Sequence, residues 1–267
     1  MVLIAVAGGT GHAGRAVAAD AAGRGLKVRS VSRHVPETAG PGRVAGVEHV
    51  AADFRTGDGV AEALAGVDLL VETLDARTGP SLKALPATTV AVLAAAQRAQ
   101  VSRCVLLTIV NAAQSSMGYY QVQAARARSY EASGMPTTVV YATQFHDLVA
   151  GIFSAGSRVG IIPTFSGVSF QSIATADVAR VLVDEAVAGL GTGAEVHRSI
   201  KAGGPSVWPM KSMGEQWKSA TGRRGVVASM PLPGSFGTFL RAGKNLVPDA
   251  AVGRLEFNDW LAAGPRG

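Results

Sequence analysis

A glycine-rich turn close to the N-terminus is the feature that most limits what this chain can fold into. The apolar run of residues 2–7 breaks at Gly8, and apolar residues resume from Ala16. This order predicts a buried parallel strand, a tight turn and a helix. Gly8 suits the tight turn, Gly11 a close backbone approach to a phosphate, and Gly14 close packing of helix on strand. The N–H groups at the helix start then predict a site for the pyrophosphate of a dinucleotide.

Beyond this turn, strand-like and helix-like stretches alternate as far as residue 145. The expected strands are 27–33, 47–51, 68–74, 103–109 and 137–141, and the expected helices are 59–64, 81–98 and 119–132. Six strands alternating with helices predict an α/β protein, a Rossmann doubly wound parallel sheet of about six or seven strands. Residues 1–145 are expected to form the NAD(P)-binding Rossmann region.

The remaining residues, 146–267, are expected to form a smaller C-terminal substrate-binding region of the same compact domain. A strand is expected at 168–173 and a helix at 175–188. Helical and loop elements at 208–221 and 236–261 are expected above the carboxyl ends of the strands, where a substrate pocket forms in such folds.

Composition limits the class of protein. The chain has 267 residues and a net charge of +6, but its Lys and Arg residues are scattered, so no nucleic-acid partner is expected. The sequence shows no basic leader and no apolar run long enough for a membrane span, which predicts a cytoplasmic protein without a membrane contact. The single cysteine, Cys104, lies in an apolar run and is expected to be a buried, inert thiol.

The end of the second expected strand bears on the choice of cofactor. An NAD-dependent enzyme usually places an acidic residue there for the adenosine 2′-hydroxyl. This chain has Ser32 and Arg33 instead, and a hydroxyl beside a guanidinium suits a 2′-phosphate, which favours NADP(H) over NAD(H). The alternative is that Arg33 is an ordinary exposed loop residue.

Other residues are expected along the cofactor. Asp53 and Phe54 follow the third strand and are placed against the adenine, although Asp53 alternatively caps the next turn. Thr73, Leu74 and Asp75 leave the fourth strand beside the middle of the cofactor. The full expected cofactor-binding set is Gly8, Thr10, Gly11, His12, Ala13, Gly14, Ser32, Arg33, Asp53, Phe54, Thr73, Leu74, Thr108 and Gln123.

With these features the chain resembles the atypical short-chain dehydrogenase/reductases, in particular the NmrA-like NAD(P)H-binding group. The matching stretches are 8–14, Ser32-Arg33, Asp53, 133–140, Gln144-Phe145, 175–179 and 258–261. The resemblance implies a Rossmann fold, NADPH binding and often the reduction of a carbonyl or an activated double bond.

The resemblance also implies a catalytic set. Short-chain dehydrogenases commonly use a Ser or Thr with a Tyr-x-x-x-Lys pair, in which the lysine lowers the pKa of the tyrosine and holds the ribose. Here Tyr119 takes the tyrosine position, Gln123 stands where lysine is expected, and Thr108 approximates the hydroxyl position. Gln123 can hydrogen-bond a ribose hydroxyl but carries no charge, so the pKa of Tyr119 is expected to stay near its reference value of about 10. Arg126 and Arg128 are expected on other faces of this helix, so that neither replaces the lysine.

Proton delivery is then expected from elsewhere. His146, just after the sixth strand, is one candidate, with a structural or merely exposed histidine as the alternative. Tyr120 and Tyr141 are further hydroxyl donors, with core packing as the alternative for each. The five histidines and one cysteine show no metal-ligand spacing.

These features predict an NADPH-dependent reductase of a small apolar or aromatic organic substrate, which suits specialised metabolite biosynthesis. One alternative is a redox-inactive NADP(H)-binding sensor or regulator. Another is a cofactor-assisted non-redox biosynthetic enzyme: a cyclase, a dehydratase or an isomerase. A monomer or a homodimer is expected.

Overall fold

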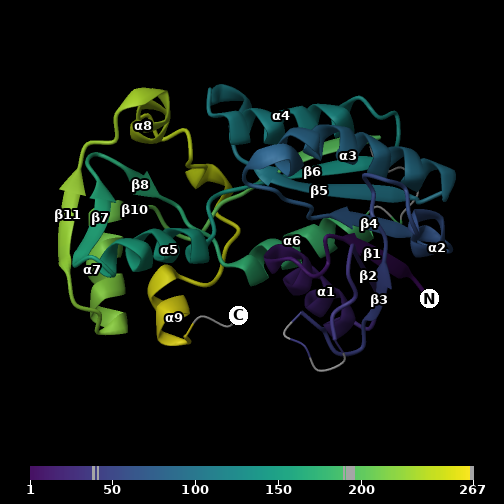
Figure 1. The fold of residues 1–267 in the computed structure, drawn as a ribbon, viewed down its shortest axis with the longest axis horizontal. Coiled ribbons are helices and arrows are strands. Elements are labelled where there is room, and N and C mark those ends of the chain that lie inside the picture. The colour runs from purple at the N-terminus through teal and green to yellow at the C-terminus, as the bar shows by residue number, and fades with distance from the viewer. Residues whose placement is uncertain (38–39, 41, 189, 191–195, 265–267) are drawn as a thin grey trace. The chain divides into compact units, whose positions relative to one another are not determined.

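The chain folds into two compact units in a computed structural model, which describes all residues except 38–39, 41, 189, 191–195 and 265–267 (Figure 1). The first unit comprises residues 1–108, 121–140 and 178–200, and the second comprises residues 109–120, 141–177 and 201–267. Each unit is assembled from several stretches of the chain. The division at residue 145 into a cofactor-binding and a substrate-binding region stays a prediction.

A seven-stranded sheet is the centre of the first unit. Its strands are β1 (Leu3–Ala7), β2 (Lys27–Ser32), β3 (Glu48–Ala51), β4 (Leu69–Glu72), β5 (Arg103–Ile109), β6 (Thr137–Ala142) and β9 (His197–Ala202), the last three of which end in the second unit. The strand order is β3-β2-β1-β4-β5-β6-β9, and β1 pairs in parallel with both β2 and β4. The predicted α/β fold with a doubly wound parallel sheet is therefore confirmed.

Helices cover both faces of this sheet. They are α1 (His12–Gly23), α2 (Val60–Leu64), α3 (Gly79–Arg98), α4 (Gly118–Glu131) and α6 (Thr175–Ala188). Figure 1 shows α3 and α4 over one face and α1 and α6 over the other. Because both faces are covered, β4 is buried along its whole length and β1 along nearly all of it, which explains their unbroken apolar sequences.

The strand order reverses between β1 and β4. These two strands pair side by side in parallel, so their carboxyl ends lie at the same edge of the sheet. The Thr73 N–H donates a 2.9 Å hydrogen bond to the Ala7 carbonyl, and Ala7 pairs with Glu72 in the register. In sheets of this type the ligand crevice lies at this reversal.

The second unit is built from short elements. They are α5 (His146–Ser157), β7 (Ile161–Phe165), β8 (Ser169–Phe170), β10 (Trp208–Pro209), α7 (Met210–Thr221), β11 (Val226–Met230), α8 (Gly234–Arg241), α9 (Phe257–Ala262) and two 3₁₀ turns, Ala112–Gln114 and Pro248–Ala250. β7 pairs in parallel with β11, and β8 pairs antiparallel with β10. Helices α5 and α7 pack on β7, with the rings of Phe153 and Trp217 6.0 Å apart.

Several elements of the second half were not expected from the sequence. The expected strand at 168–173 is only the two residues of β8, in a separate small sheet, and no element was assigned to the residues of α5, β7, β9 or β11. These strands form through pairing with distant segments, for example β7 with β11. Local periodicity in the sequence therefore predicts them poorly.

No helix among the described residues is both long and apolar enough to cross a membrane. Cys104 is fully buried in β5, and burial raises the pKa of its thiol to about 12, which confirms the predicted buried thiol and keeps it protonated.

The glycine turn sets how closely α1 approaches β1. Gly8 has a φ of +82°, a conformation that favours glycine. A Cβ added at Gly14 would lie only 2.2 Å from the Gly8 carbonyl oxygen. Because that oxygen belongs to the backbone, it cannot move aside as a flexible side chain does. The contact therefore requires glycine at position 14, and the positive φ favours glycine at position 8.

Gly14→Ala is expected to destabilise the protein by about 1–3 kcal/mol, the usual cost of forcing an extra methyl group into a packed site. The matched control is Gly23→Ala in the same helix, where an added Cβ meets no atom within 4 Å. Thermal unfolding of the two variants checks this. Equal melting temperatures for the two variants would contradict the packing role of Gly14.

Candidate functional site

The start of α1 has the geometry of an anion site. Helix α1 begins at His12, with Gly11 in extended conformation before it. Among the described side chains none caps this helix, and its first turn contains no acidic residue. A Cβ at Gly11 would contact the Gly8 oxygen at 3.1 Å, so even a methyl group is tight there. The start of a helix presents backbone N–H groups, and the start of α1 thus fits the pyrophosphate of a dinucleotide.

The end of β2 is fastened to this turn by side chains. The N–H and the hydroxyl of Thr10 both donate to the Ser32 hydroxyl oxygen, at 3.1 and 2.9 Å. A Cβ at Gly9 would lie 2.3 Å from the hydroxyl oxygen of Ser30, so β2 lies directly against the turn. Arg33 comes immediately after β2 and is exposed. This places Ser32 at the turn itself, and its contact with a 2′-phosphate stays a prediction.

A second arginine at the turn was missed by the sequence analysis. The Arg15 Nη1 donates to the Thr10 carbonyl at 3.3 Å, so its guanidinium reaches back over the turn from α1. The available signal was its position directly after Gly14, in the first turn of the helix.

The residues after β3 are occupied by local contacts. Asp53 Oδ1 accepts a 2.8 Å hydrogen bond from the N–H of Arg55, which is the turn-capping contact considered as the alternative. Phe54 is buried, so its ring packs within the protein. A contact of either residue with adenine stays a prediction.

The residues after β4 line the other side of the turn. The Thr73 hydroxyl donates to the Ala7 carbonyl at 3.0 Å. A Cβ at Gly8 would lie 3.1 Å from the Leu74 nitrogen. Thr73 and Leu74 thus lie against the glycine turn, and their place beside the middle of the cofactor stays a prediction.

Helix α4 carries the predicted catalytic positions. Tyr119 is half-buried and lies edge-on to Tyr120, with ring centroids 6.1 Å apart. Gln123 is one helical turn further along. The Thr108 hydroxyl, at the end of β5, donates to the backbone carbonyl of Gln123 at 3.3 Å. Thr108 and Gln123 are therefore brought together, through a backbone atom.

The expectation that Arg126 faces away from Gln123 is wrong. Arg126 Nη1 donates to Gln123 Oε1 at 2.7 Å. Residues three apart on a helix lie on neighbouring faces, and the long arginine side chain spans the remaining angle. Gln123 Nε2 in turn donates to Asp75 Oδ1 at 3.1 Å.

Arg126 is paired with the buried carboxylate of Glu72. Its Nη2 donates to Glu72 Oε1 at 2.9 Å, and both side chains are almost fully buried. Thr89 and Tyr130 also donate their hydroxyls to Glu72, at 2.7 and 2.9 Å. Burial and the Glu72 charge raise the pKa of Tyr130 well above its usual value, so the phenol stays protonated. The positive charge nearest the usual lysine position is thus neutralised by Glu72.

An aromatic cluster lies in the second unit. The ring of Tyr120 lies 5.4 Å from that of Phe236 and 5.5 Å from that of Phe239, edge-on to both. Burial raises the pKa of Tyr120, and the Gln144 side-chain amide donates to its hydroxyl at 3.4 Å. Tyr120 is thus packed in the core, whereas Tyr141 is half-buried.

His146 is fully buried in the second unit, and both ring nitrogens have protein partners. Nε2 donates to the Leu255 carbonyl at 3.0 Å, which leaves Nδ1 to accept from the Ser172 hydroxyl at 2.8 Å. The ring also packs against Phe257 and Trp260. Burial lowers the pKa of His146, so the imidazole is neutral. These contacts match the structural alternative rather than a proton donor.

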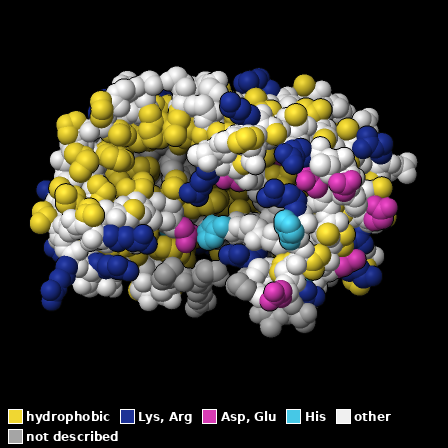
Figure 2. All heavy atoms as spheres, viewed as in Figure 1, with side chains coloured by type: hydrophobic (Ala, Val, Ile, Leu, Met, Phe, Trp, Pro, Cys, Tyr) yellow, Lys and Arg dark blue, Asp and Glu magenta, His cyan; other side chains and the backbone are white. Residues whose placement is uncertain are grey.

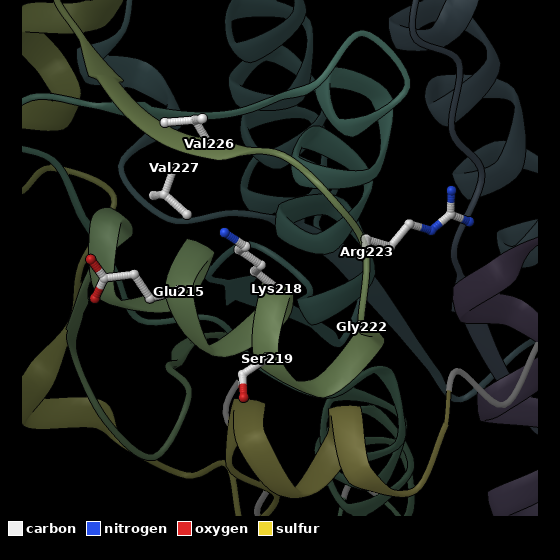
Figure 3. Close-up of a pocket in the computed structure, with 7 residues that line it drawn as sticks. All are labelled: Glu215, Lys218, Ser219, Gly222, Arg223, Val226 and Val227. Atoms are coloured by element: carbon white, nitrogen blue, oxygen red, sulfur yellow. The ribbon is translucent and has the colours of Figure 1, made fainter.

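The surface of the second unit is rich in apolar groups. Figure 2 shows hydrophobic side chains gathered over this unit, while Lys and Arg are dispersed. A hollow of about 620 Å³ lies between α7 and β11 and is lined by Glu215, Lys218, Ser219, Gly222, Arg223, Val226 and Val227 (Figure 3). None of the predicted catalytic residues is among them. Among the described residues, no group of His, Cys, Asp and Glu is arranged to hold a metal ion.

Comparisons with known proteins identify the family. The model of the NAD(P)H-binding family matches residues 8–187, more than half of the chain, and the chain therefore belongs to this family. This confirms the expected NAD(P)H-binding group and its nicotinamide cofactor. A search of curated protein sequences finds no match.

Solved structures share the fold at low sequence identity. An NADPH-dependent quinone oxidoreductase from Escherichia coli, complexed with NADPH, has a TM-score of 0.76 and 17% identity, covering 97% of this chain and 99% of that one. A nucleoside-diphosphate-sugar epimerase from Staphylococcus aureus has a TM-score of 0.68 and 17% identity, covering 98% and 96%. A UDP-Glc/GlcNAc 4-epimerase from Campylobacter jejuni has a TM-score of 0.73 and 10% identity, covering 88% of each chain.

The neutral, buried His146 predicts a pH dependence of stability. Because its pKa is lowered in the folded state, the unfolded chain binds the proton more readily, and stability falls as the pH drops below the unfolded value of about 6.5. The contribution of one such group is at most about 1.4 kcal/mol per pH unit. Urea unfolding between pH 7.5 and 5 checks this. His146→Gln is expected to flatten the slope, and an unchanged slope would contradict the assignment.

Proposed function

We propose that this chain is an NADPH-dependent reductase of a small apolar or aromatic acceptor in which the charge left by hydride addition is delocalised. A quinone or an activated double bond is such an acceptor. The observation that carries the proposal is Gln123, held between Asp75 and Arg126 at the position where this class of enzyme usually has lysine.

The anion-binding turn supports the NADPH part of the proposal. The first N–H groups of α1 fit the pyrophosphate, and Ser32 with Arg33 fits a 2′-phosphate, because serine donates a hydroxyl and arginine offers a fixed fork of donors. When bound, NADPH supplies a hydride. The residues after β4, at the strand-order reversal, lie at the crevice where such folds bind a dinucleotide.

The class of acceptor follows from the absence of a lysine ammonium at position 123, beside Tyr119. Reduction of a simple ketone leaves a strongly basic alkoxide, which needs a proton from a tyrosine whose pKa has been lowered. Tyr119 lacks that ammonium, and Glu72 neutralises Arg126. Hydride addition to a quinone leaves a phenolate instead, whose conjugate acid has a pKa near that of tyrosine, about 10, so solvent can supply the proton. The fold likeness to a quinone oxidoreductase and the aromatic cluster of the second unit are consistent with this class.

A second candidate function is a redox-inactive NADPH-binding regulator. The same neutral Gln123 favours it, because a regulator needs cofactor affinity without a tuned tyrosine. Binding of NADPH without its oxidation by any quinone, enone or ketone would favour this candidate over the reductase. A cofactor-assisted cyclase, dehydratase or isomerase instead predicts product formation without net consumption of NADPH.

Cofactor preference tests the role of Arg33. NADPH is expected to bind more tightly than NADH, and Arg33→Ala is expected to weaken NADPH binding by about 10-fold, as the loss of one charge-assisted contact does, while NADH affinity stays the same. Calorimetric titration of both cofactors checks this. Arg223→Ala, in the second unit, is the matched control for charge. Equal affinities of the wild type for the two cofactors would refute the 2′-phosphate assignment.

Acceptor choice tests the reductase. NADPH oxidation is expected to be at least about 10²-fold faster with quinones than with simple ketones, the usual worth of a missing general acid. Tyr119→Phe is expected to slow quinone reduction by less than about 10-fold, because no tyrosine proton is required. Absorbance at the nicotinamide band gives both rates. Efficient ketone reduction that depends on Tyr119 would contradict the proposed acceptor class.

A further inference from the structure

The side chain at position 123 is fixed at both ends. Arginine has only hydrogen-bond donors, so the contact with Arg126 must engage the Gln123 oxygen and turns its nitrogen toward Asp75. The amide cannot rotate to offer its oxygen to a ligand without breaking the bond to Arg126. Gln123 is itself only 3% exposed, whereas Asp75, the residue that it holds, is exposed.

Arg126 cannot move away from this position. It is 1% exposed, and its Nη2 and Nε are bound to Glu72 and to the Thr89 hydroxyl, at 2.9 and 3.0 Å. A buried guanidinium that left its carboxylate would leave two uncompensated charges. Glu72 and Thr89 therefore keep Arg126 in position for its hydrogen bond to Gln123.

The network closes on one short segment of the chain. Glu72 ends β4 and is fully buried, whereas Asp75, three residues later, is exposed. Arg126 and Gln123 bridge these two carboxylates from α4. The bridge fixes the intervening Thr73 and Leu74, which lie against the glycine turn. The exposed end of the network is thus a carboxylate held at the carboxyl edge of the sheet, beside the anion-binding turn.

We propose that Asp75 binds the nicotinamide ribose, and that Gln123 and Arg126 are positioning residues for its carboxylate. This rests on the proposed function, in that it requires the nicotinamide half of NADPH to lie over the end of β4. A carboxylate accepts hydrogen bonds from both hydroxyls of a vicinal diol, and the ribose offers such a diol. The usual lysine donates to these hydroxyls, whereas Asp75 accepts from them, so the polarity of the contact is reversed.

The test compares two ligands that differ in the nicotinamide ribose. NADPH contains it, and adenosine 2′,5′-bisphosphate keeps only the adenosine half. Asp75→Ala is expected to weaken NADPH binding by about 10-fold and to leave bisphosphate binding unchanged, both measured by calorimetry. Glu62→Ala removes an exposed carboxylate of α2 in the same unit and is the matched control, with no change for either ligand. An unchanged NADPH affinity for Asp75→Ala would overturn the proposal.

The positioning roles are tested by non-additivity. Gln123→Met, and the double variant Arg126→Met with Glu72→Gln, are expected to weaken NADPH but not bisphosphate binding. The double variant removes the buried charge pair together, so that no unpaired charge remains. Adding Asp75→Ala to either is expected to cause no further loss, because coupled residues act through the same contact. Arg103→Met is the control for the loss of a buried arginine of the same unit.

The outcomes separate this proposal from the proposed function. If the network were purely structural, its variants would weaken the binding of both ligands equally, or their losses of NADPH affinity would add to the loss caused by Asp75→Ala. Either result overturns the positioning roles. A wild-type protein that binds NADPH but reduces no acceptor would refute the reductase, while the ratio of the two affinities would still report on Asp75.

Discussion

The ion pair between Glu72 and Arg126 is the interaction on which the side-chain network around Gln123 depends. Both groups are buried, and separating them would cost about 3–5 kcal/mol, so they stay together. This pairing positions Arg126 so that it donates to Gln123, and the hydrogen bond fixes the orientation of the Gln123 side-chain amide. A lysine at position 123 would meet the guanidinium instead of accepting from it. The neutral residue there is thus matched to its surroundings.

A second constraint is steric. Gly8 and Gly14 allow α1 to lie against the end of β1, and Gly9 lets β2 approach through Ser30. Thr10 and Thr73 then tie the turn to its neighbouring strands. The result is a turn at which the start of α1 faces the carboxyl ends of β1 and β4, a geometry suited to a pyrophosphate.

The two units differ in how their polar groups are used. In the first, buried charges are paired and end in the exposed Asp75. In the second, His146 is buried as a neutral ring with both nitrogens engaged, and Tyr120 is packed among aromatic rings. His146 and Tyr120 thus serve packing in this unit.

The sequence by itself determined the class of parallel sheet and the glycine turn, because alternating strand and helix periodicity and the spacing of glycines are local patterns. It also identified the absence of lysine at position 123. Only the tertiary structure decided what Gln123 does, because its orientation depends on Arg126, and Arg126 depends on Glu72, which is 54 residues away. The burial of His146 was decided in the same way, by Ser172 and Leu255. Local patterns record backbone periodicity, whereas the partners of a buried polar side chain are fixed by which distant segments the fold packs around it.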